Sequence, residues 1–145
     1  METDLTTVIK TDEVRLNTKG NGDIIDITSQ ISKCVETSKI KSGVVTVFIA
    51  GSTAGITTLE YEPGLLKDFP QIMEKLIPSN AVYHHDETWH DGNGFSHLCS
   101  AIIGTDLTIP FVDGKLSLGT WQQVVFCEFD NRPRLRKVIL QIMGE

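Results

Sequence analysis

The sequence has few cysteines and no long apolar run. Its 145 residues include only Cys34, Cys99 and Cys127, which are far apart and form no CxxC pair. A thiolate zinc site is therefore not expected, and each cysteine is predicted to be a small core residue rather than a nucleophile. No apolar run approaches the roughly 20 residues that a membrane-spanning helix needs. Residues 1–10 are polar, contain two acids and do not resemble a secretory signal, so a reducing, cytoplasmic location is expected.

Positive charge is also scarce. Thirteen lysines and arginines face nineteen acids, which gives a net charge of −6. Such a chain is not expected to bind nucleic acid through bulk charge or to act at a membrane. Four cations nevertheless gather within six residues, at Arg132, Arg134, Arg136 and Lys137. This run is either a solvated strand face or a phosphate site, for which the guanidinium forks of Arg132 and Arg134 are suited.

The remaining pattern predicts an α+β chain with a largely antiparallel sheet system, and its length suits a single domain over residues 1–145. Helices are expected at 28–38, with Thr28 or Ser29 as N-cap and Gly43 as the stop, at 63–77 and at 96–103. Pro70 implies a kink, or a second helix capped by Asp68. Residues 86–93 are expected to form a polar loop. Strands are expected at 5–10, 14–16, 24–27, 44–50 (buried on both faces), 56–60, 81–84, 107–112, 115–118, 121–129 and 135–142.

All four histidines lie within fourteen residues, and His84 is the weakest candidate because it adjoins His85. Neutral imidazole is a common ligand of zinc and similar cations, so His85, His90 and His97 are candidate metal ligands. Asn93 or Ser96 is expected to cap the following helix and to place His97 in its first turn. Asp91 and Asn93 lie in the same stretch and are candidate catalytic groups. A metal site, an acid/base site or a solvated loop each fit this pattern.

Two further segments contain candidate binding groups. Ser52 and Thr53 lie in a Gly-Ser-Thr-Ala-Gly turn after the strand at 44–50, where backbone N–H groups can approach a ligand. Glu60 ends the next strand and is a candidate general base, a ligand anchor or a surface residue. Trp121 and Gln122 follow a glycine after the Asp113-Gly114 hairpin and suit a pocket wall for a planar ring, although a core tryptophan fits equally.

In combination these motifs resemble one family. The segments HxxxxWHDGNGxSH (84–97), IPFVDGKLSLGTWQQ (109–123) and EFDNRPRxR (128–136) are similar, in this order, to those of the YjbQ-like family. The resemblance runs from about residue 44 to residue 144. It implies an α+β fold with a β-sandwich-like core, assembly as a homotrimer and, for some members, a weak secondary thiamine-phosphate synthase activity. Its motif residues match His85, Asn93, His97, Ser52, Thr53, Ala54 and Glu60.

The chain departs from this family at one position. Many members begin the turn after the buried strand with histidine, where this chain has Gly51. We hypothesise that His90 supplies the missing imidazole.

The sequence therefore leaves three alternative functions. The first is a synthase-type transferase that binds a divalent metal, expected to be zinc, and a small phosphorylated substrate. The second is a non-catalytic trimeric module for a metal or small ligand, and the third is a metal-dependent hydrolase.

Overall fold

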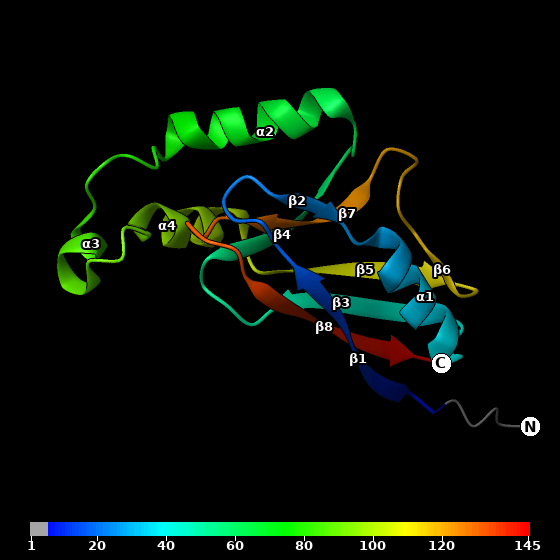
Figure 1. Cartoon of the computed structure of the whole chain (residues 1–145). Coiled ribbons are helices and arrows are strands. Elements are labelled where there is room, and N and C mark those ends of the chain that lie inside the picture. Colours follow the sequence, from blue (N-terminus) through cyan, green and yellow to red (C-terminus); the bar gives the residue numbers. More distant parts are fainter. Residues whose placement is uncertain (1–5) are drawn as a thin grey trace, which may run out of the picture.

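Two antiparallel sheets form the centre of the molecule. The computed structural model describes residues 6–145 (Figure 1). One sheet has the strand order β1-β8-β3-β5-β6, and a smaller one has the order β2-β7-β4. The predicted α+β fold with an antiparallel sandwich is confirmed. The strands are β1 (Val8–Asn17), β2 (Ile24–Asp26), β3 (Gly43–Ile49), β4 (Ala54–Leu59), β5 (Asp106–Val112), β6 (Lys115–Leu116), β7 (Gln123–Glu128) and β8 (Leu135–Gly144).

Four helices accompany these sheets within residues 6–145: α1 (Thr28–Ser38), α2 (Pro63–Leu76), α3 (His84–Trp89) and α4 (Gly94–Ile103). Helices α2 and α4 lie on the side of the smaller sheet (Figure 1). None of the helices in this part of the chain is both long and apolar enough to cross a bilayer.

Strand β7 is the strand with two buried faces. Val124 and Phe126 pack into the core between the two sheets, whereas Val125 and Cys127 pack into a second core beneath α2 and α4. The expectation that the strand at 44–50 is buried on both faces is wrong. Strand β3 belongs to the larger sheet, where Val45 and Val47 point inward but Phe48 is exposed.

Residues 8–17 form one strand rather than two. Strand β1 begins at Val8 and runs unbroken to Asn17, across the gap between the two predicted strands, because it pairs with β8 along its whole length. Residue 5 of the first predicted strand lies outside the described residues. Helix α1 begins after Ile27 without a side-chain cap, so the predicted caps are wrong: the Thr28 hydroxyl donates to Asp26 and accepts from the Val124 N–H. Lys39, in a left-handed conformation, ends α1, and Gly43 lies in β3.

Helix α2 continues through Pro70, so a second helix capped by Asp68 does not form. Glu62 caps its start instead and accepts hydrogen bonds from the Gly64 and Leu65 N–H groups. The chain around the histidines also differs from expectation. Residues 81–84 form no strand, and α3 occupies much of the predicted loop at 86–93.

Asp86 explains the unexpected helix. Its carboxylate accepts from the Tyr83 N–H at the start of α3 (3.4 Å) and from the Gly94 N–H at the start of α4 (2.9 Å). One acidic side chain therefore joins the starts of two short helices and fixes the segment between them. Helix α4 begins after Asn93, one of its two predicted caps, although the Asn93 side chain makes no capping hydrogen bond.

Candidate functional site

Three segments that are distant in the sequence meet at Asp130. This carboxylate is fully buried and accepts a hydrogen bond from Arg134 Nε (2.7 Å) and one from the Asn131 N–H (2.8 Å). The Thr53 hydroxyl, from the turn between β3 and β4, lies 3.3 Å away. The Asn93 amide, at the start of α4, lies 3.4 Å away. Asp130 therefore connects the predicted threonine turn, the histidine-bearing segment and the arginine turn.

The ionised form of Asp130 is favoured. Burial alone would raise the pKa of this carboxyl, but the hydrogen bonds from Arg134 and the Asn131 N–H, with the charge of Arg134, lower the pKa below its ordinary value. Asp130 is thus a fixed negative charge that orients the Arg134 guanidinium.

A second buried ion pair lies beside the first. Glu128 is about 1% exposed and accepts from Arg136 through both Nε (2.8 Å) and Nη2. The Thr18 hydroxyl donates to Glu128 as well (2.8 Å), and Arg136 Nη2 donates to the Thr53 hydroxyl (2.8 Å). Glu128 was not among the candidate residues, and Arg136 was noted only as part of the basic run at 132–137. That run is a signal for the arginine, whereas nothing in the sequence singles out Glu128 as its partner.

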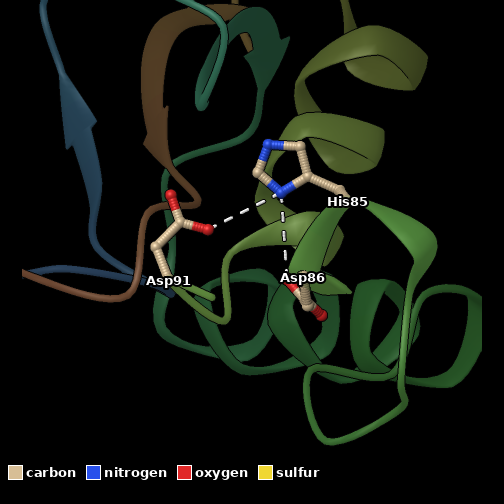
Figure 2. Close-up of side chains that lie close together, drawn as sticks. All are labelled: His85, Asp86 and Asp91. Atoms are coloured by element: carbon tan, nitrogen blue, oxygen red, sulfur yellow. Dashed lines mark ion pairs between the residues drawn. The ribbon is translucent and has the colours of Figure 1, made fainter. Parts of the chain in front are cut away.

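His85 lies beside two carboxylates (Figure 2). Its Nδ1 atom is 3.8 Å from Asp86 Oδ1 and 3.7 Å from Asp91 Oδ1. Within residues 6–145, these three residues are the only group of at least three His, Cys, Asp or Glu side chains with ligand atoms all within 4.8 Å of one another. The buried Nδ1 atom of His85 has no hydrogen-bond partner, so its lone pair is not committed within the described residues. The group fits a divalent cation through one imidazole and two carboxylates.

The other candidate residues of the histidine-bearing segment differ in how close they lie to the His85–Asp86–Asp91 group. The His97 ring lies next to the His85 ring, with centroids 4.4 Å apart and ring planes tilted by 43°. His90 is exposed, ends α3 with a φ of 58° and does not belong to the group. The Asn93 amide lies between two carboxylates: in one orientation its nitrogen donates to Asp130, and in the other to Asp91 Oδ1 at 2.9 Å.

Other predicted site residues lie apart from this centre. Arg132 and Ser52 are exposed, one in the turn after β7 and the other in the turn before β4. Glu60 and the Trp121–Gln122 pair lie at the opposite end of the β4–β7 ladder, since Ala54 pairs with Glu128 and Leu59 with Gln123. A six-residue strand spans about 20 Å, so one chain does not bring Glu60 to Asp130. Trp121 is 71% exposed, and Gln122 accepts from the Gly119 N–H.

The three cysteine thiols are not activated as nucleophiles. Cys99 and Cys127 belong to the core beneath α2, and burial raises the pKa of Cys127 to about 12 and that of Cys99 to about 11. Burial also raises the pKa of Cys34 to about 11, with a hydrogen bond to Asp12 adding to the effect. These thiols stay protonated at neutral pH, in agreement with their predicted packing role.

Comparison with known proteins gives the family. The family model for the UPF0047 protein YjbQ-like group matches residues 12–145. The chain belongs to this family. An Archaeoglobus fulgidus UPF0047 protein is 40% identical over 131 residues, which cover 90% of this chain and 99% of the relative. Bacillus subtilis YugU is 32% identical over 133 residues, which cover 90% of this chain and 97% of YugU.

Solved structures agree with this membership. A protein of unknown function from Sulfolobus solfataricus superposes on this YjbQ-like chain with a TM-score of 0.90, at 30% identity, over 97% of this chain and all of the other. A Clostridium acetobutylicum member gives a TM-score of 0.78 at 36% identity, over 89% of this chain and 98% of the other. These likenesses confirm the family and the fold.

Proposed function

We propose that this YjbQ-like protein is a divalent-metal-dependent enzyme that acts on a small phosphorylated substrate, of the secondary thiamine-phosphate synthase type that the resemblance implies. One observation supports the proposal most directly. Asp130 binds Arg134 and contacts the Asn93 amide, and the Asn131 side chain donates to the Asp91 carbonyl (2.8 Å). The segment that suits a cation and the segment that suits an anion are therefore held against each other.

The metal would be bound by His85 and Asp91. Asp86 already accepts two backbone hydrogen bonds, so its main role is to fix the segment, with a remaining oxygen lone pair available to the cation. His97 lies against the His85 ring and would orient it or complete the ligand set. When bound, a zinc-like ion would neutralise charge on the leaving group. The exposed His90 is left outside this set in our proposal.

The substrate's phosphate would be bound by Arg134, which Asp130 orients. The exposed Arg132 would provide a second positive charge at the edge of this site. In the orientation in which its nitrogen faces Asp91, the Asn93 amide would hold that carboxylate in place. In the synthase reaction, the thiazole nitrogen forms a bond to the activated methylene while the bond between this methylene and its diphosphate breaks, and pyrophosphate leaves. Positioning and charge compensation supply the catalysis, without a covalent intermediate on the protein.

The predicted homotrimer is part of the proposal. Within one chain, Glu60 and Trp121–Gln122 lie far from Asp130, so they would contribute to a site only if a neighbouring copy brought them there. The exposure of Leu135 (86%), next to Arg134, is consistent with a surface that another copy covers. A cytoplasmic location also stays an expectation, consistent with three cysteines that form no disulfide.

A turnover assay tests this function. Metal-loaded protein is mixed with a pyrimidine-methyl diphosphate and a thiazole phosphate, and pyrophosphate release is followed. We expect release by the wild type and a loss of at least tenfold in Asp91→Asn, because an amide is a poorer cation ligand than a carboxylate. Glu87→Gln is the matched control, since this exposed neighbour is expected to keep the activity.

The alternatives give different results in the same assay. Tight binding of the substrates without turnover would replace the enzyme with a binding module. Release of inorganic phosphate from simple phosphoesters, without condensation, would identify a metal-dependent hydrolase.

A further inference from the structure

Arg136 has donors that its ion pair does not use. The side chain is about 10% exposed and gives Nε to Glu128 and Nη2 to Glu128 and Thr53. Its Nη1 atom has no hydrogen-bond partner in residues 6–145, although a guanidinium has five N–H donors in a fixed plane. The Nη1 edge of this mostly buried guanidinium is therefore free to donate to an acceptor that comes from outside the chain.

Gly51 lies directly over this free edge. A Cβ atom at this exposed glycine would lie 3.2 Å from Arg136 Nη1 and 3.9 Å from the Ile49 side chain, with no other neighbour within 4 Å. An oxygen atom at that position would be within hydrogen-bond distance of Nη1. Because Gly51 has no side chain, a ligand can reach Arg136 Nη1 from the solvent.

Backbone donors complete the corner. The Gly51 N–H is bonded to the Ile49 carbonyl, but neither the Ser52 N–H nor the Thr53 N–H has an acceptor in the described part of the chain. Free backbone N–H groups close to a guanidinium provide further donors for an oxyanion. The turn between β3 and β4 lies beside the start of β8, which contains Arg136 (Figure 1).

We propose that this corner, formed by Arg136 Nη1 and the Ser52 and Thr53 N–H groups, is a binding site for a phosphate group, and that Gly51 is the residue that admits it. This inference rests on the proposed function, for which it names a phosphate-binding residue beyond Arg132 and Arg134. Because Glu128 offsets the charge of Arg136, the corner has little net positive charge. It would bind the anion mainly through its hydrogen-bond donors. Millimolar rather than micromolar affinity for inorganic phosphate is expected.

The test uses metal-free wild-type protein, inorganic phosphate as the probe and the amide spectrum as the readout. Sodium phosphate is titrated against sodium chloride of equal ionic strength. We expect saturable shifts of the Ser52 and Thr53 amide signals with phosphate and none with chloride. Shifts that do not saturate, or that spare these two amides, would overturn the proposal.

Variants at two glycines provide the control. Gly51→Val covers Nη1 and is expected to weaken phosphate binding at least tenfold. Gly119→Val is matched, because a Cβ there lies 3.2 Å from the flexible end of Gln122 at the other end of the smaller sheet, and it is expected to bind like wild type. Equal binding by Gly51→Val and wild type would refute the role of Gly51. Arg136 itself is left unchanged, because its removal would strand buried Glu128 and endanger folding.

The outcome is separable from that of the proposed function. Phosphate binding at Gly51 without pyrophosphate release leaves the corner established and the synthase rejected. Pyrophosphate release with equal phosphate binding by Gly51→Val rejects the corner alone.

Discussion

Asp130 is the residue on which the candidate site depends most. It is buried, yet it stays ionised because Arg134 and a backbone N–H donate to it. Replacing it with asparagine would keep the shape but remove the charge that Arg134 pairs with. We expect Asp130→Asn to lower the free energy of unfolding at pH 7 by about 2 kcal/mol, as measured by urea denaturation.

The pH dependence of that difference follows from the sign of the pKa shift. A carboxyl with a lowered folded pKa stabilises the fold fully above its unfolded pKa, near 3.9, and the contribution is lost as pH falls through the folded pKa. The gap between wild type and Asp130→Asn should thus be constant from pH 5 to 7 and shrink below about pH 4. The exposed Asp106→Asn is the control and should show no such gap. A gap that persists unchanged at pH 2 would contradict this account.

At the scale of elements, the larger sheet depends on a close approach of two strands. Gly43 of β3 pairs with Gly144 of β8, and a Cβ at Gly43 would lie 2.0 Å from the Met143 carbonyl oxygen. Because backbone cannot move away as a side chain can, Gly43→Ala is expected to destabilise the fold by about 1–3 kcal/mol or to separate the strand ends. Thermal unfolding beside Gly119→Ala measures this effect. Equal melting temperatures for the two variants would show that the contact is not tight.

The sequence predicted elements well where one local signal dominated. The Asp113-Gly114 turn, the periodicity of residues 63–77 and the apolar run at 44–50 correspond to a hairpin, a helix and a strand. Helix α3 was missed because its six residues have no apolar periodicity and its start depends on Asp86, whose bond to the Gly94 N–H is a tertiary contact. The burial of β3 was overestimated because a continuous run of apolar residues does not show whether one face of a strand or both are covered by other elements.

At the scale of the whole molecule, strand register decides which candidate residues meet. The histidine, threonine and arginine segments were each identifiable from the sequence, and they do gather at one end of the smaller sheet. Glu60 and Trp121 were grouped with them, but the β4–β7 pairing places both at the other end. Asp86 was not selected, and Arg136 was noted only within the basic run, because their roles come from contacts between segments, which one sequence does not reveal.

Metal content is the measurement that tests the central claim most directly. Wild-type protein, His85→Ala and His84→Ala are loaded with zinc or manganese, desalted and analysed for metal per chain. His84 is the matched control, because it adjoins His85 in α3 but its side chain is fully exposed to solvent. We predict about one ion per chain in wild type and His84→Ala, and loss of that ion in His85→Ala. An ion retained in His85→Ala, or none bound by wild type, would contradict the proposed metal site.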